Sequence, residues 1–69
     1  MPLTLARPGE INSIKRVGGR EDAKKRLETL GFVVGGAISV VSEINGNLIV
    51  NIKDSRVAIS REMANKIVI

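Results

Sequence analysis

The chain has 69 residues, the length of one small domain, and we predict a single domain over residues 1–69. It has no cysteine and no histidine, which excludes disulfides, thiolate-bound metals and histidine-based acid–base catalysis. Hydrophobic residues make up 43% of the chain, and their β-branched, aromatic-poor character is typical of a compact sheet. The net charge of +4 favours acidic partners. Because the residues that most catalysis requires are missing, the composition indicates a protein that acts by binding.

The first part of the chain is predicted to be an extended lead-in followed by one strand. The lead-in covers residues 1–9 and ends in the turn signal Pro8-Gly9. Residues 10–17 carry an apolar side chain at every third position, which interrupts strict alternation. We therefore expect a strand with a bulge, ended by Gly18-Gly19.

A helix is predicted from Arg20 to Leu30. Ala23, Leu27 and Leu30 lie at i, i+4 and i+7, on one helical face. Gly31 follows at the position where a left-handed glycine ends many helices. We expect a Leu30→Ala substitution to unfold the domain, because losing a buried leucine costs about 2–5 kcal/mol. The predicted core residues are Leu27, Leu30, Phe32 and Val40.

Residues 37–44 and 48–53 are predicted to form a hairpin around Asn45-Gly46-Asn47. A two-residue loop would place Leu48 opposite Glu43. A three-residue loop would pair Ile44 with Leu48 and would give a more apolar face. Because register follows the buried face, we predict three loop residues with Asn47 left-handed.

The last part of the chain is predicted to hold two strands and a short helix. Asp54-Ser55 is a turn before a strand over residues 56–59, and Ser60 is a suitable N-cap for a helix over residues 61–66. Residues 67–69 then form a terminal strand. Five short strands with tight turns indicate a mainly β protein with one or two short helices, arranged as a small barrel or partly open barrel.

Catalytic and metal-binding patterns are missing from the sequence. The seven carboxylates are mostly interleaved with basic residues, and Glu21-Asp22, the only adjacent pair, points in different directions on a helix. Gly18-Gly19 precedes a helix but lacks the Gly-Lys-Ser/Thr of a phosphate-binding loop. No base follows a nucleophile at a recognised spacing. We expect no enzyme activity and no cofactor.

No targeting or membrane-spanning segment is visible. No cationic segment leads into an apolar run at the N-terminus. The longest nearly apolar stretch, residues 31–41, is too short to cross a bilayer. We expect a cytoplasmic protein that does not span the membrane.

Lys24-Lys25-Arg26 is the densest basic cluster. Its members spread over about 200° of a helix, which indicates a solvated face more than a focused patch. Tyrosine and tryptophan are absent and Phe32 is expected in the core, so stacking-based nucleic-acid binding is disfavoured. Electrostatic binding to phosphate backbones stays open.

Several segments combine into a pattern that covers essentially the whole chain. They are residues 25–32, which end in Leu30-Gly31-Phe32, then Gly35 before a strand, residues 38–41, and residues 57–69. In combination they resemble the ferrous iron transport protein A (FeoA) family. Val34 stands where that family commonly has proline, and residues 45–47 replace a frequent Gly-Asp-Pro. Both departures are turn variations that leave the expected fold unchanged.

The resemblance implies an SH3-like β-barrel, in agreement with the strands predicted independently. It also implies a cytoplasmic accessory protein of the Feo ferrous iron uptake system, whose partner is the membrane permease FeoB through its GTPase-bearing cytoplasmic portion. Any ferrous iron contact of this chain is expected to be weak and carboxylate-based. The alternative is an SH3-like regulatory or nucleic-acid-binding module related to the C-terminal domain of iron-dependent repressors. No helix-turn-helix accompanies the domain, which weighs against that alternative.

Candidate partner-binding residues are chosen from the expected exposed helix face and from the rim of loops and strands. Ordinary solvated surface would explain each of them equally well. The candidates are Lys24, Lys25, Glu28, Asn45, Asn47, Arg56 and Arg61.

Overall fold

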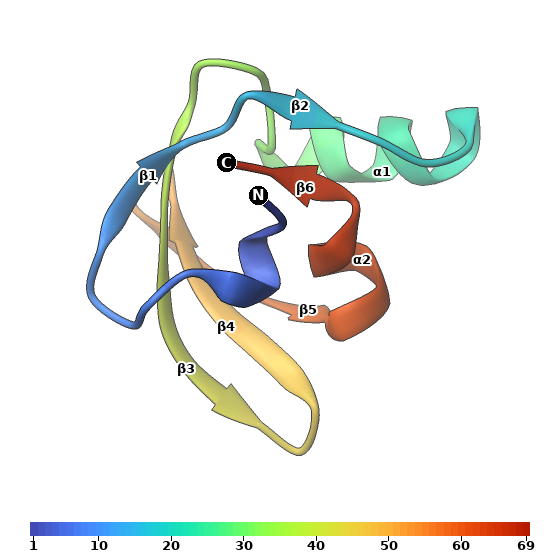
Figure 1. Cartoon of the computed structure of the whole chain (residues 1–69). Coiled ribbons are helices and arrows are strands. Elements are labelled where there is room, and N and C mark those ends of the chain that lie inside the picture. The colour runs from blue at the N-terminus through green and yellow to red at the C-terminus, as the bar shows by residue number, and fades with distance from the viewer.

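The computed structural model describes all 69 residues and contains two small antiparallel sheets with two helices (Figure 1). The larger sheet has the strand order β1-β3-β4-β5, and the smaller one pairs β2 with β6. The predicted class, mainly β with two short helices, is confirmed, although the two sheets do not close into one continuous barrel. The elements are η1 (Leu3–Leu5), β1 (Ile11–Ser13), β2 (Arg16–Val17), α1 (Glu21–Leu30), β3 (Ala37–Ile44), β4 (Asn47–Ile52), β5 (Ser55–Ser60), α2 (Arg61–Asn65) and β6 (Ile67–Val68).

The single strand predicted over residues 10–17 is in fact two strands that belong to different sheets. β1 pairs with β3, whereas β2 pairs with β6. Between them Ile14 is buried, and its backbone exchanges hydrogen bonds with Gly35 and Gly36. The three-residue spacing that suggested a bulge therefore marks the point where the chain leaves one sheet for the other.

The helix α1 ends as predicted and begins one residue later, with Arg20 as its N-cap, but its buried stripe is narrower than expected. Gly31 adopts φ 106° and ends the helix, which confirms the predicted left-handed glycine. Leu27 is fully buried, whereas Leu30 is 42% exposed, so the prediction that Leu30 belongs to the core is wrong. Leu30 is turned by about 60° from Leu27 around the helix axis, which takes it to the edge of the buried face. Phe32, just beyond the helix, is buried instead.

The hairpin β3–β4 has a two-residue loop, so the predicted three-residue loop is wrong. Asn45 and Gly46 both have positive φ, as the commonest two-residue hairpin turn requires, and Ile44 pairs with Asn47. The register shifts between Val40 and Ser42, which is a bulge at the strand centre. Beyond that bulge Val40 pairs with Val50. The extra residue in β3 thus places the apolar side chains of β3 and β4 opposite one another, as at Val40 and Val50, although the loop has only two residues.

The C-terminal elements lie close to their predicted positions. The second tight turn is at Lys53-Asp54, one residue earlier than predicted, with both residues at positive φ. The Ser60 hydroxyl accepts a hydrogen bond from the Met63 N–H at 3.2 Å, which confirms Ser60 as the N-cap of α2.

The core is one apolar cluster that the chain termini help to close. The lead-in is not simply extended, because it contains η1, where Leu3 is fully buried. Met1 and Ile69 exchange two hydrogen bonds, of 2.8 and 2.7 Å, which hold the two ends of the chain side by side. Neither α1 nor α2 has the length and apolar character of a membrane-spanning helix. The buried cluster consists of Leu3, Ile14, Val17, Leu27, Phe32, Ile38, Val40, Leu48, Val50, Ile52, Ile59, Ala64, Ile67 and Ile69.

Candidate partner-binding surface

All seven candidate side chains are exposed, but they do not form one patch. One group lies on α1, and a second lies where the β3–β4 turn meets the start of α2. Arg56 is separate, near the opposite end of β5. The α1 group is Lys24, Lys25 and Glu28, and the second group is Asn45, Asn47 and Arg61.

The second group lies at the free end of the β3–β4 hairpin, which projects from the body of the domain (Figure 1). Asn47 pairs with Ser60, the residue before Arg61, which brings the hairpin turn beside α2. Arg61 donates a hydrogen bond to Glu43 and forms with it the one ion pair of the structure. Both side chains are about half exposed, so the pair contributes little to stability.

An exposed isoleucine completes this region. Ile44 is 56% exposed and pairs with Asn47, on the opposite face of the hairpin from Glu43. An apolar side chain among amides and charges is the arrangement found in many protein–protein contacts. We name Glu43, Ile44, Asn45, Asn47 and Arg61 the hairpin-end surface. Sequence reasoning missed Ile44 because the three-residue loop had placed it opposite Leu48 in the core.

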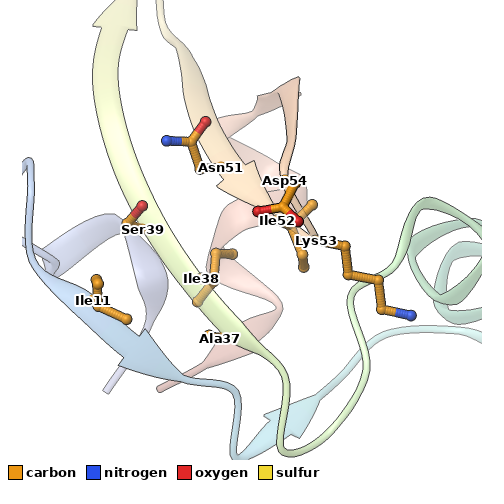
Figure 2. Close-up of a pocket in the computed structure, with 8 residues that line it drawn as sticks. All are labelled: Ile11, Ala37, Ile38, Ser39, Asn51, Ile52, Lys53 and Asp54. Carbon is orange, nitrogen blue, oxygen red and sulfur yellow. The ribbon is translucent and has the colours of Figure 1, made fainter.

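Arg56 lies beside a shallow hollow on the larger sheet. Its Nε donates to Oδ1 of Asn51 at 3.4 Å, and Asn51 lines the hollow. Figure 2 shows Ser39 and Asn51 on neighbouring strands, with the Lys53 side chain extending toward the segment after α1. The hollow has a volume of about 490 Å³ and is open to solvent. Its lining residues are Ile11, Ala37, Ile38, Ser39, Asn51, Ile52, Lys53 and Asp54.

The hollow offers shape and a few polar groups but no assembled reactive centre. No hydrogen bond joins the Ser39 hydroxyl to a basic or acidic side chain. Its two charged residues, Lys53 and Asp54, belong to the β4–β5 turn. The sequence could not indicate this hollow, because it forms only where β1, distant in the chain, pairs with the β3–β4 hairpin.

The carboxylates of the chain are dispersed. All seven are exposed, and no three metal-ligating side chains gather at one place. Glu21 and Asp22 lie in the first turn of α1, where the helix dipole stabilises negative charge.

Comparison with known proteins gives the family. A family model described as the FeoA domain matches residues 1–69. A protein of Methanocaldococcus jannaschii named "Putative Fe(2+) transport protein A" is 34% identical over 68 residues, which cover 99% of this chain and 83% of that protein.

Solved structures agree on the fold. Iron(II) transport protein A from Clostridium thermocellum matches with a TM-score of 0.92 at 24% identity, over 99% of this chain and 43% of that one. FeoA from Stenotrophomonas maltophilia, an SH3 domain protein solved with zinc, matches with a TM-score of 0.85 at 23% identity, over 99% and 87%. A manganese-dependent transcriptional repressor matches with a TM-score of 0.86 at 18% identity, over 97% and 39%.

These structural likenesses show the SH3-like fold that the resemblance implied. The family match extends over the complete chain and agrees with the segments around Leu30-Gly31-Phe32 and the C-terminus. The chain belongs to the FeoA family.

Proposed function

We propose that this chain is a cytosolic accessory protein of ferrous iron uptake that binds and modulates an FeoB-type membrane permease. The observation that carries the proposal is the FeoA-domain match over residues 1–69. A relative named for Fe(2+) transport, 34% identical over nearly the same length, supports the same pathway. The partner contact would be made with the GTPase-bearing cytoplasmic portion of the permease, without catalysis by this chain.

The hairpin-end surface is the part of the molecule best suited to that contact. It lies at the projecting turn of the β3–β4 hairpin, where all five of its residues are exposed to a partner (Figure 1). Ile44 supplies apolar area on one face, and the Arg61–Glu43 pair lies on the other. Exposed apolar side chains within a polar rim contribute most of the free energy in many protein interfaces.

Ferrous iron would be the cargo of the permease and not a tightly held ligand of this chain. Histidine and cysteine are absent, and the carboxylates are exposed and dispersed. Isolated carboxylates bind divalent cations weakly, because a tight site needs several oxygen ligands together. We therefore propose that any ferrous iron contact is weak and carboxylate-based.

The test is a binding titration between the chain and the isolated cytoplasmic portion of the FeoB-type permease. An Ile44→Ser variant is expected to weaken binding by about fivefold or more, since an interface anchor contributes more than about 1 kcal/mol. Ile11→Ser is the matched control, because Ile11 is also an exposed strand isoleucine but lies on β1. Absence of binding by the unmodified chain would refute the proposal, and equal losses in both variants would refute the surface.

A second candidate function is a nucleic-acid or regulatory module, and the fold likeness to a transcriptional repressor supports it. Against it, Phe32 is the only aromatic residue and is fully buried, so no stacking platform exists. Salt-sensitive binding to DNA or RNA, with no binding to the permease portion, would favour this second function.

A further inference from the structure

The charge of the protein is concentrated at one end. Seven basic and three acidic residues lie in β2, in α1, in the segments next to them and at Lys66, which gives this end a net charge of +4. The remaining four basic and four acidic residues cancel, so this end carries the whole formal excess. We name it the basic end. Its basic residues are Lys15, Arg16, Arg20, Lys24, Lys25, Arg26 and Lys66.

The fold, and not the sequence alone, brings Lys66 into this group. β2 pairs with β6, and the Gly18 N–H donates to the Lys66 carbonyl at 2.7 Å. The aliphatic part of the Lys66 side chain lies against Gly19, where an added Cβ would approach Lys66 Cδ to 2.9 Å. Arg20 follows Gly19 directly, and Lys24 lies one helical turn beyond Arg20. Lys66, Arg20 and Lys24 therefore lie near the start of α1.

These cations are free to meet an external partner. None of the seven forms an ion pair, because the single ion pair of the structure is Arg61–Glu43 at the hairpin end. Six of them are exposed and Lys66 is half-buried. Arg20 precedes α1 without making a side-chain cap. No internal contact therefore accounts for the concentration of charge.

Two exposed apolar side chains border the basic end. Leu30 lies one helical turn from Arg26 on α1. Val34 is 68% exposed, and its neighbour Gly35 donates a hydrogen bond to the Ile14 carbonyl, beside Lys15. In Figure 1 this loop and β2 run along the same side of the molecule. Cations beside exposed leucine and valine are the combination that binds a lipid interface.

We propose that the basic end binds the anionic headgroup surface of a phospholipid bilayer. The hairpin-end surface then points away from the lipid and stays accessible to a protein partner. Headgroups respond to net charge within a Debye length and need no exact geometry, which suits cations that spread around a helix. A nucleic acid would offer nothing to Leu30 and Val34. The lipid contact does not depend on the permease contact proposed above.

The test is sedimentation of the chain with vesicles of phosphatidylcholine alone or mixed with phosphatidylglycerol, at low and at physiological salt. The chain is expected to bind only the mixed vesicles, and less at the higher salt. The variant Arg20→Gln/Lys24→Gln should bind about 25-fold more weakly, since each of the two cations near an anionic surface contributes about fivefold. Circular dichroism checks that it is folded.

The matched control is Arg7→Gln/Arg56→Gln, which removes the same total charge outside the basic end. It should bind the mixed vesicles as the unmodified chain does. In the same way Val34→Ser should weaken binding, whereas Leu5→Ser, an equally exposed apolar site elsewhere, should not. Equal losses in the two double variants would overturn the proposal, because total charge would then explain them.

Absence of binding to the mixed vesicles at low salt would also overturn it. If Arg20→Gln/Lys24→Gln then loses binding to the soluble permease portion or to a nucleic acid, the basic end binds that partner instead of lipid. Vesicles and the permease portion are assayed separately. Failure of the lipid contact therefore leaves the proposed permease contact standing, and failure of the permease contact leaves the lipid contact standing.

Discussion

Leu27→Ala and Leu30→Ala remove the same atoms from the same helix but should affect stability very differently. Leu27 is fully buried in the main core cluster, whereas Leu30 is 42% exposed at the edge of the buried face of α1. Truncating Leu27 leaves a cavity, because the apolar cluster around it can relax only partly. Truncating Leu30 mainly removes a half-solvated side chain and leaves no closed cavity.

The expected magnitudes follow from burial. Leu27→Ala should lower the free energy of unfolding by about 3 kcal/mol, within the range for buried leucines. A domain of 69 residues has a total of about 3–10 kcal/mol, so this variant is expected to lose between about a third and all of its stability. Leu30→Ala should cost about 1 kcal/mol or less. The corresponding falls in Tm are about 12–24 °C for Leu27→Ala and at most about 8 °C for Leu30→Ala.

Thermal and urea unfolding, followed by far-ultraviolet circular dichroism, measures both variants under one set of conditions. The unmodified chain fixes the reference Tm and the urea dependence. Equal losses, or a larger loss for Leu30→Ala, would refute the packing of α1 described above. An unfolded Leu30→Ala would restore the expectation drawn from helical periodicity alone.

The other predictions concern a cap, a turn and the metal. Ser60→Ala should lower the free energy of unfolding by about 1 kcal/mol through loss of the bond to Met63, and Ser60→Asp should restore most of it; equal stability of Ser60→Ala would contradict the cap. Gly46→Ala should cost about 1 kcal/mol by forcing an alanine to positive φ, whereas Asn45→Gly should be nearly neutral; chemical denaturation measures both. Calorimetric titration with ferrous iron under anaerobic conditions should give no saturable binding in the micromolar range, and a stoichiometric site would contradict the dispersed carboxylates.

Local signals predicted the elements well and their long-range partners less well. The end of α1, the left-handed Gly31 and the Ser60 cap depend on residues close in sequence, and each is confirmed, whereas α1 begins one residue later than predicted. The split of β1 from β2 depends on which distant strand each one pairs with, and spacing alone could not decide that. The hairpin shows the same limit, because the bulge at Val41 changes the register four residues before the turn.

The candidate surface was predicted only as scattered exposed positions. The exposure of Lys24 or Asn47 could be predicted from their polar character. Which exposed residues lie close together in the fold could not be predicted in that way. Pairing of Asn47 with Ser60 brings the hairpin turn beside Arg61, and pairing of β2 with β6 brings Lys66 beside Gly19. Ile44 was missed because its exposure depends on the length of one turn.

The most direct test of the proposed permease contact is an NMR titration of the isotope-labelled chain with the unlabelled cytoplasmic portion of the FeoB-type permease. Saturable shifts are predicted for the amides of residues 43–47 and 60–61, while those of the α1 residues 24–28 stay in place. No shifts at any accessible concentration would contradict the permease as partner, and shifts confined to α1 would contradict the hairpin-end surface as its binding site.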